Sequence, residues 1–243
     1  MLFRSITATA TSGGTINPSG SVVATYGDDQ TFVITPDAGY HIADILVDGL
    51  SVSAVSTVAF ETITAAHTIH AVFEIDTFKI TATAWAGGFI DPSGTVIATY
   101  GDDVNFAISP AVGYHIADVI VDGLSVSAVS SYTFNAVAAS HSITAVFAIN
   151  TYELKITAGP NGIVSPSGTV VVNYGDSLTV IITPDVGYDV LDAVIDGTTH
   201  LGNVLSYTFV AVTSNRSLHA TFIDESAPLV VITASASIGG TIN

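Results

Sequence analysis

The chain has 243 residues, no cysteine and a formal net charge of −17, from 4 basic and 21 acidic residues. So acidic a chain repels phosphate backbones and anionic lipid surfaces, which excludes nucleic acid as an expected partner. The mean hydropathy is +0.60, but no apolar run approaches the roughly 18 residues that a membrane-spanning helix needs. Membrane insertion is therefore not expected in this segment, and the lack of cysteine fits either redox compartment.

One sequence unit of about 70 residues occurs three times in tandem, which is typical of an array of modules. Its copies begin at Ile6, Ile80 and Ile156, and Ile232 opens a truncated fourth copy. Other landmarks recur in register: Pro18, Pro92 and Pro166; Gly27, Gly101 and Gly175; Tyr40, Tyr114 and Tyr188; Phe73, Phe147 and Phe222.

The repeat predicts the organisation of the whole chain. We expect a non-repeat lead-in at residues 1–5, repeat modules at 6–79, 80–155 and 156–231, and the start of a fourth module at 232–243. The lead-in is interpreted as an artefact of sequence assembly, with a short natural extension as the alternative. Because the connections at 74–79 and 148–155 are short and not rich in Gly and Ser, an elongated, semi-rigid array is predicted.

Within one copy the pattern predicts short strands separated by turns. In the second copy the expected strands are 79–84, 95–100, 105–109, 114–121, 131–137 and 142–147, and residues 136–140 could form one helical turn at most. Asp122-Gly123 lies between two apolar runs and predicts a tight hairpin, since both turn positions favour positive φ. The fold class expected is therefore all-β, as three small β modules.

Positions that are apolar in every copy predict the hydrophobic core: Ile6, Ile80 and Ile156; Phe60, Phe134 and Phe209; Ile69, Ile143 and Leu218; Phe73, Phe147 and Phe222. The tyrosines at 26, 100 and 174 are expected to pack beside this core. A module of this size lies near the lower limit for a self-sufficient core, so dense packing or contact with a neighbouring repeat is needed.

The ordered motifs of the second copy resemble the divergent form of the internalin-type bacterial B-repeat. They are Gly87-Gly88, Pro92-Ser93-Gly94, Tyr100-Gly101-Asp102, 113–123, 132–134 and 141–147. The resemblance covers residues 6–224 and resumes at Ile232. It implies a β-grasp-like fold, tandem arrays in secreted or cell-surface proteins of prokaryotes, and no catalytic residues.

Aspartates recur at three positions of every copy: Asp28, Asp102 and Asp176; Asp44, Asp118 and Asp192; Asp48, Asp122 and Asp196. Carboxylates gathered at loops could hold Ca²⁺, which takes about 6–8 oxygen ligands. However, no Asp-x-Asp-x-Asp-Gly loop is present, and Asp29 and Asp103 are replaced by Ser177 in the third copy. Turn chemistry explains these residues better, so neither a metal site nor a cofactor is predicted.

Histidines recur at two positions in the first two copies and are replaced in the third: His41, His115 and Asp189 at one, and His67, His141 and Arg216 at the other. Because arginine is not a metal ligand, a repeated zinc site is not expected, and the histidines are interpreted as exposed strand residues. Trp85 is the single tryptophan, so it cannot be a repeated ligand site. The tyrosines at 40, 114 and 188 are interpreted as core residues rather than as a binding groove.

No catalytic motif is present: the sequence lacks a Gly-x-Ser-x-Gly elbow, His-Glu-x-x-His and a phosphate loop. The sequence therefore predicts a protein without enzyme activity, which serves as a structural stalk or spacer of a prokaryotic cell-surface or secreted protein. Two alternatives remain: an adhesin-type repeat that binds glycan or protein, and accessory repeats of a secreted enzyme. The expected partners are the neighbouring repeats and an unknown glycan or protein ligand.

Overall fold

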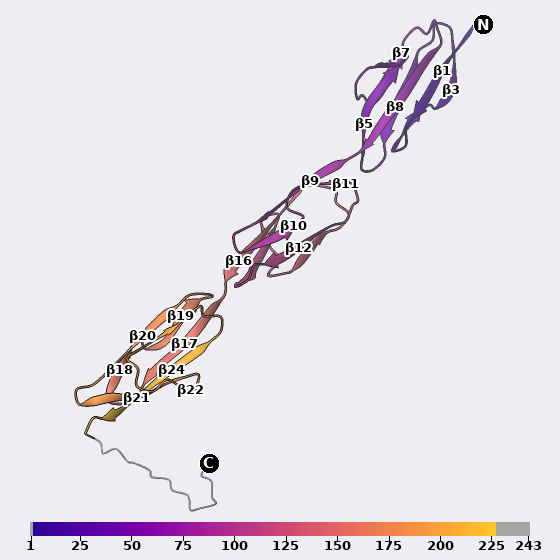
Figure 1. Cartoon of the computed structure of the whole chain (residues 1–243). Helices are drawn as coiled ribbons and strands as arrows, with labels where there is room; N and C mark the ends of the chain where they lie inside the picture. Colours follow the sequence, from indigo (N-terminus) through magenta and orange to yellow (C-terminus); the bar gives the residue numbers. More distant parts are fainter. Residues whose placement is uncertain (1, 227–243) are drawn as a thin grey trace, which may run out of the picture. The chain divides into compact units, whose positions relative to one another are not determined.

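The computed structural model describes residues 2–226, and within this range it contains strands and no helix. The strands form three successive sets of eight, one set for each repeat (Figure 1). The first repeat contains β1 (Phe3–Ala10), β2 (Gly14–Asn17), β3 (Gly20–Thr25), β4 (Gln30–Pro36), β5 (Tyr40–Val47), β6 (Leu50–Ser51), β7 (Thr57–Phe60) and β8 (His67–Ile75). The all-β prediction is confirmed.

The second and third repeats have the same series of strands. The second contains β9 (Thr77–Ala84), β10 (Gly88–Asp91), β11 (Gly94–Thr99), β12 (Val104–Pro110), β13 (Tyr114–Val121), β14 (Leu124–Ser125), β15 (Ser131–Phe134) and β16 (His141–Ile149). The third contains β17 (Thr151–Ala158), β18 (Gly162–Ser165), β19 (Gly168–Asn173), β20 (Leu178–Pro184), β21 (Tyr188–Ile195), β22 (Thr199–His200), β23 (Ser206–Phe209) and β24 (Arg216–Asp224).

Each repeat is built from a five-stranded and a three-stranded sheet. In the first repeat the strand orders are β3-β1-β8-β5-β6 and β2-β4-β7, and the other repeats have the equivalent orders. Strand β1 pairs antiparallel with β3 and parallel with β8, so the first and last strands of the repeat lie together in the middle of the larger sheet. A parallel pair of first and last strands is what the β-grasp-like expectation implies, but none of the described residues forms the helix of a β-grasp.

Alternating residues of the two sheets form a hydrophobic core in each repeat. In β4, Phe32 and Ile34 are buried while the residues beside them are exposed, and in β1 Ile6 and Ala8 are buried. Successive side chains of a strand point to opposite faces, so these residues lie on the inner faces of the sheets. The expected core residues are buried, except that Phe222 is only partly buried in the third repeat.

The Asp-Gly pairs form the predicted tight turns between β5 and β6 and at the equivalent places. Asp122 and Gly123 have φ values of 49° and 82°, and the other two pairs are also in the left-handed region. Both central residues of a type I′ hairpin need positive φ, which Asp and Gly adopt at low cost. The turn prediction is therefore confirmed for Asp122-Gly123, and the first repeat has the same two-residue turn, since Val47 pairs with Leu50. In the third repeat Ile195 pairs with Thr199, so Asp196 and Gly197 lie in a three-residue loop.

Some elements differ from the sequence prediction. The short strands β10 and β14 were not expected, because residues flanked by Gly, Pro and Ser were predicted to form turns. Residues 136–140 form no helical turn. The opening strands begin at Phe3, Thr77 and Thr151, before the predicted module boundaries. Residues 3–5 of the expected lead-in belong to β1 and pair with β3. The truncated fourth module at 232–243 lies outside the described residues.

The chain divides into two compact units. One comprises Met1–Ala111 with Ile116–Phe147, and the other Val112–His115 with Ala148–Asn243. The first repeat and most of the second therefore belong to one unit, and the third repeat belongs to the other together with the loop at residues 112–115. None of the described residues forms a helix long and apolar enough to cross a bilayer.

Candidate functional site

The aspartate of each Asp-Gly turn is bound to the last long strand of its repeat. Nδ1 of His67 donates to Oδ2 of Asp48 over 2.7 Å, and the amide of Thr68 donates to Oδ1 over 2.8 Å. His141 makes the same bond to Asp122, at 2.7 Å. In the third repeat Nε of Arg216 donates to Oδ2 of Asp196 over 2.5 Å, so a different side chain makes the equivalent contact.

The histidines at 67 and 141 are not the freely exposed strand residues that the sequence suggested. Their side chains keep only 27% and 26% of their exposure, because each ring packs against a core phenylalanine. The ring of His141 stacks on Phe134 with the centroids 4.7 Å apart, and the guanidinium of Arg216 lies 5.6 Å from the ring of Phe209. This cluster joins the Asp-Gly turn to the core and therefore has a structural role.

These bonds predict a dependence of stability on pH. The hydrogen bond from His67, followed by that from the amide of Thr68, lowers the pKa of Asp48 below its usual value of 3.8. Because the pKa is lower in the folded state, the stabilisation is complete above about pH 4 and is lost as the pH falls through the folded pKa. Acid titration of the unfolding midpoint should show this loss. Asp48→Asn should reduce the dependence of the unfolding midpoint on acid pH. A pH dependence that this substitution leaves unchanged would contradict the assignment.

The other recurring aspartates also bond close to their own positions. Oδ1 of Asp118 accepts from the amide of Val119 and from Oγ of Ser125, and Asp44 has the same two bonds in the first repeat. Asp102 accepts from Thr99, whose hydroxyl and then amide lower the pKa of this carboxyl. Among the described residues no three His, Cys, Asp or Glu side chains gather in a geometry for a metal ion.

We therefore expect weak, salt-sensitive binding of Ca²⁺ at most. The carboxylates of Asp48, Asp102 and Asp118 each already accept two local hydrogen bonds, so coordinating a metal there would require breaking them. Titration calorimetry of the whole chain with CaCl₂ should give small heats that diminish as NaCl is raised. A tight transition with one site per repeat, abolished in the second repeat by Asp102→Asn, would overturn this expectation.

The repeats also share a contact between a tyrosine ring and a glycine. A Cβ added to Gly39 would lie 2.1 Å from the ring of Tyr100, so only glycine allows the ring to lie this close. The backbone reinforces the contact: the amide of Asp76 donates to the carbonyl of Gly39 over 2.8 Å, and the amide of Tyr100 donates to the carbonyl of Asp76 over 2.9 Å. Nδ1 of His41 lies 2.8 Å from Oδ1 of Asp76.

The same arrangement occurs in the second unit. A Cβ on Gly113 would lie 2.3 Å from the ring of Tyr174. The amide of Asn150 donates to the carbonyl of Gly113, and the amide of Tyr174 donates to that of Asn150, both over 2.8 Å. His115 bonds to Asn150 over 2.8 Å, as His41 does to Asp76. We call this set of residues the tyrosine–glycine joint.

The joint corrects the expectation that the tyrosines at 26, 100 and 174 pack beside the core of their own repeat. The side chain of Tyr26 is 50% exposed and that of Tyr100 is 39% exposed, and Tyr100 packs against a glycine of the preceding repeat. The tyrosine at 40 fits its core interpretation better, because its ring packs on the core cluster of the first repeat while remaining partly exposed.

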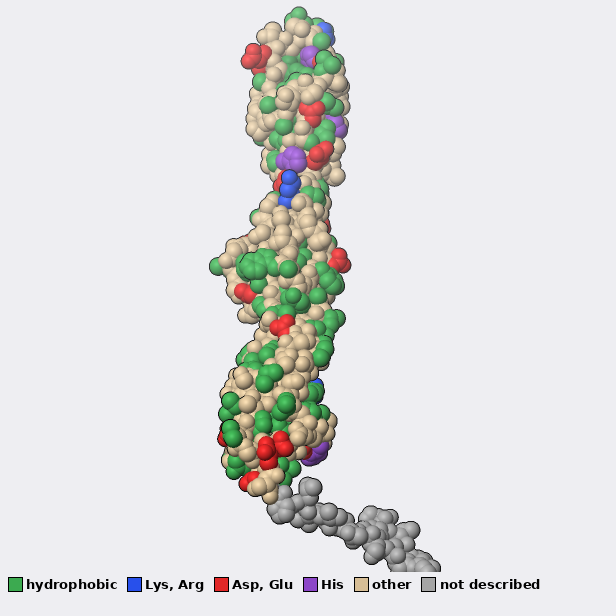
Figure 2. Space-filling view, turned by 60° about the vertical axis from the view of Figure 1, so that its left-hand side comes forward, with side chains coloured by type: hydrophobic (Ala, Val, Ile, Leu, Met, Phe, Trp, Pro, Cys, Tyr) green, Lys and Arg blue, Asp and Glu red, His purple; other side chains and the backbone are tan. Residues whose placement is uncertain are grey.

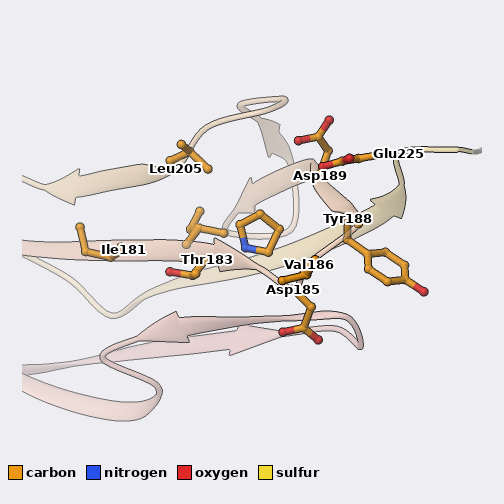
Figure 3. Close-up of a pocket in the computed structure, with 11 residues that line it drawn as sticks. Ile181, Thr183, Asp185, Val186, Tyr188, Asp189, Leu205 and Glu225 are labelled. Atoms are coloured by element: carbon orange, nitrogen blue, oxygen red, sulfur yellow. The ribbon is translucent and has the colours of Figure 1, made fainter.

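At Gly187, the equivalent glycine of the third repeat, no described side chain takes the place of the tyrosine ring. A Cβ added there would meet no atom within 4 Å. Gly187 lies in a pocket of about 660 Å³. Figure 3 shows Ile181 and Leu205 at one end of this pocket and Tyr188 and Glu225 at the other. The amide of Glu225 donates to the carbonyl of Gly187 over 3.0 Å, so the backbone is arranged as in the joint.

The comparisons with known proteins identify the family. The sequence model of the divergent InlB B-repeat domain matches residues 4–77, 78–151 and 152–226. The chain therefore belongs to the divergent InlB B-repeat family, as the resemblance of its motifs predicted. A search of the curated proteins found no match.

Several solved structures are distantly similar. The Bacillus anthracis TIE protein is 13% identical with a TM-score of 0.42, over 90% of this chain and 50% of that chain. This chain thus spans half the length of that protein. The four N-terminal Ig domains of Dscam1 isoform 7.44 match with 5% identity and a TM-score of 0.16, over 91% of this chain and 72% of that chain. The I9–I11 tandem of titin matches with 6% identity and a TM-score of 0.15, over 90% and 98%. Likenesses this low define neither the fold nor the function of this chain.

The tyrosine–glycine joint was not predicted from the sequence. The recurring tyrosines at 26, 100 and 174 were expected to pack beside the core, and Gly39 and Gly113 were not singled out, because a glycine before a strand is also what a simple turn requires. One signal was available: Tyr26, Tyr100 and Tyr174 each precede Gly-Asp in a turn, where a large aromatic side chain needs a partner outside its own strand.

Proposed function

We propose that this chain is a non-catalytic stalk or spacer of a prokaryotic cell-surface or secreted protein, in which repeated modules separate other parts of the protein. The observation that carries this proposal is the position of the recurring residues in the structure. Most of those that appear in all three repeats lie in a core, in a turn, or in the tyrosine–glycine joint, and Asp44, Asp118 and Asp192 accept hydrogen bonds from nearby residues of their own repeat. Because these recurring side chains stabilise a repeat or join it to the next one, they support a mechanical function rather than a chemical one.

The surface chemistry is consistent with a spacer. The face in Figure 2 carries few Lys, Arg, Asp and Glu side chains among uncharged polar atoms and scattered apolar side chains. Charged residues make up only 10% of the chain, and the acidic residues outnumber the basic ones by 21 to 4. A surface of net negative charge resists nonspecific association of an extended protein with other acidic surfaces.

An adhesin-type repeat is the second candidate. Its support lies in the second repeat, where Trp85 and Phe89 are 60% and 59% exposed and no equivalent tryptophan exists in the other repeats. Exposed aromatic rings can stack on sugars or on apolar side chains of a partner. Accessory repeats of a secreted enzyme would have the same module fold, so a catalytic domain elsewhere in the protein would decide in favour of that function.

Small-angle scattering of the chain in dilute solution tests the spacer. At module radii of gyration near 11 Å, three abutting modules are expected to extend over roughly 80–90 Å. A compact particle of the size of one globular domain would refute the proposal. A glycan and matrix-protein binding screen with wild type and Trp85→Ala separates the candidates: a spacer gives no signal, whereas an adhesin gives a signal that the substitution removes.

A further inference from the structure

We infer that a pocket on the outer face of the third repeat binds one acidic sugar residue, with Val194 beneath the sugar ring and Lys155 facing its anionic group. The pocket has a volume of about 430 Å³ and lies over the first half of β24 and the neighbouring strands β17, β21 and β22. Small-molecule sites have roughly 300–1,000 Å³, so this pocket suits a single sugar ring. The inference goes beyond the proposed function and does not depend on it, because a spacer and an adhesin could each carry such a site.

Strand pairing brings the lining residues together on the outer face of the larger sheet. His219 pairs with Val194, and Val194 pairs with His200 of the edge strand β22. In the next row Lys155 pairs with Ser217. The residues on either side of Lys155, Val194 and His219 are buried in the core, so these three side chains point outward. Because directly paired side chains lie about 4.5–5.5 Å apart, Val194 forms a floor with an imidazole on either side.

The third repeat differs from the other two at this place. The residues that strand pairing makes equivalent are Leu46, Ile120 and Val194 at the floor, Ser51, Ser125 and His200 beside it, and Thr7, Thr81 and Lys155 at the rim. The floor residue is thus smaller, and the surrounding side chains are longer, than in the other repeats. The loop between β21 and β22 is also one residue longer, and its Gly197 lines the pocket. These differences together form the hollow.

Both imidazoles are oriented through their Nδ1 atoms. Nδ1 of His219 lies 2.8 Å from Oγ1 of Thr157, and Nδ1 of His200 donates to Oδ2 of Asp192. Among the described residues, Nε2 of neither ring has a hydrogen-bond partner. In a neutral ring whose Nδ1 carries the proton, Nε2 is an acceptor. Nε2 of His200 can therefore accept from a sugar hydroxyl.

Lys155 selects an acidic ligand. None of the ion pairs among residues 2–226 involves this lysine. Asp192 is bonded to His200. Asp196, in the turn after β21, is bonded to Arg216. The ammonium group is thus available to a ligand, and a charge-assisted hydrogen bond to it is about twice as strong as a neutral one, which favours a sugar that carries a carboxylate or a sulfate ester.

An acidic sugar fits these groups better than an inorganic anion or an acidic peptide. The C–H groups of a sugar ring can cover Val194, while its hydroxyls can bond to Nε2 of His219 and to Oγ of Ser217, which has no hydrogen-bond partner among the described residues. An inorganic anion would leave Val194 uncovered. A peptide strand binds through a row of backbone hydrogen bonds along a sheet edge, whereas this pocket lies on the face of a sheet whose backbone groups are paired.

Titration of the ¹⁵N-labelled full chain with methyl glucuronide, followed by amide chemical shifts, tests the inference. The amides of Gly197, Ser217 and His219 should shift together and saturate with a dissociation constant on the order of 1 mM. Methyl glucoside, which lacks the carboxylate, should bind about tenfold more weakly, because it cannot form the charge-assisted bond to Lys155. Glucose 6-sulfate distinguishes the two sources of negative charge: the acidic sugar that binds more tightly carries the group that the pocket prefers.

Lys155→Gln should weaken the binding of methyl glucuronide about tenfold and leave that of methyl glucoside unchanged. Lys79→Gln is the matched control, since Lys79 is also exposed on a strand of the second repeat and its loss removes the same charge from the chain. This control should retain the affinity. Equal losses in the two variants would show an effect of net charge and would contradict a site at Lys155.

Val194→Ile and His200→Ser give the third repeat the residues of the second, so both variants are expected to fold. Ser125 already bonds to the equivalent aspartate, so a serine at position 200 keeps that contact. Val194→Ile fills the floor and His200→Ser removes one side of the pocket, so each should weaken the binding of both sugars by about fivefold. Thermal unfolding equal to that of the wild type would show that these losses come from the pocket.

Four outcomes would overturn the inference: no saturable shift of these amides up to about 50 mM methyl glucuronide, equal affinities for the glucuronide and the glucoside, an affinity that Val194→Ile leaves unchanged, or sodium sulfate or aspartyl-aspartate bound as tightly as the acidic sugar. Trp85→Ala should leave the titration unchanged, which separates this pocket from the exposed aromatic residues of the second repeat. A site this weak does not survive the washing steps of a binding screen. Failure of this titration therefore leaves the spacer untouched, and a compact particle in scattering leaves the pocket untouched.

Discussion

Replacing Phe106 by alanine is expected to destabilise the second repeat by about 3–5 kcal/mol. Phe106 is fully buried between the two sheets, and its ring meets that of Phe134 edge to face with the centroids 5.9 Å apart. Alanine removes this contact and leaves a cavity that β-sheets cannot close without shifting. At about 0.05–0.15 kcal/mol per residue, a repeat of this size has only roughly 4–11 kcal/mol in total, so the substitution removes a large part of its stability.

Amide hydrogen exchange of the whole chain measures this effect, because it reports each repeat separately where a single melting temperature would not. Protection should fall in β12 and β15 and remain in β20. Phe89→Ala is the matched control: Phe89 lies in the same small sheet but on its outer face, so its loss should change stability by no more than about 0.5 kcal/mol. Equal effects of the two substitutions would contradict the assignment of the inner face.

Replacing Gly88 by alanine is expected to cost about 1–3 kcal/mol through overpacking. The added Cβ would lie 2.4 Å from the ring of Phe147 and 2.7 Å from the carbonyl oxygen of Ser109. The ring is part of the core and the carbonyl belongs to the paired strand β12, so neither moves aside at low cost. Chemical denaturation followed by hydrogen exchange in the second repeat should show the loss.

Gly159→Ala provides the comparison. Neither Gly88 nor Gly159 has positive φ, but the nearest atom to a Cβ on Gly159 is the carbonyl oxygen of Ala220, at an ordinary 3.6 Å. Its replacement should therefore be neutral or slightly stabilising, since alanine restricts the unfolded chain more than glycine does. A stable Gly88→Ala protein would mean that Phe147 has room to turn away, and that the packing of β10 on β16 is looser than the structure indicates.

The module fold could be predicted to a large extent from the sequence. Strict alternation in segments such as 105–109 placed Phe106 and Ile108 on one face, and three copies of the same pattern removed the ambiguity of a single short strand. The Asp-Gly turns were predictable because their backbone conformation excludes most other residues. The strands β10 and β14 were missed, since four and two residues between turn residues carry no recognisable period.

The contacts between distant residues were not predictable in the same way. His141 and Arg216 occupy equivalent positions but have different chemistry, so the sequence did not predict a shared role. In the structure, each donates a hydrogen bond to the aspartate of the Asp-Gly turn in its own repeat. What they have in common is a side-chain nitrogen within hydrogen-bond distance of a carboxylate oxygen. A single sequence shows residue types but not which of them face one another.

The sequence by itself determined that this protein is a tandem array of all-β modules with apolar cores and Asp-Gly turns, because these features depend on periods of two residues and on local φ preferences. Only the tertiary structure decided where the recurring tyrosines go. Tyr100 was expected on the core of its own repeat and lies instead on Gly39 of the preceding one. The physical reason is that a joint between repeats is set by shape and by backbone hydrogen bonds between residues about 60 positions apart, which no local pattern records.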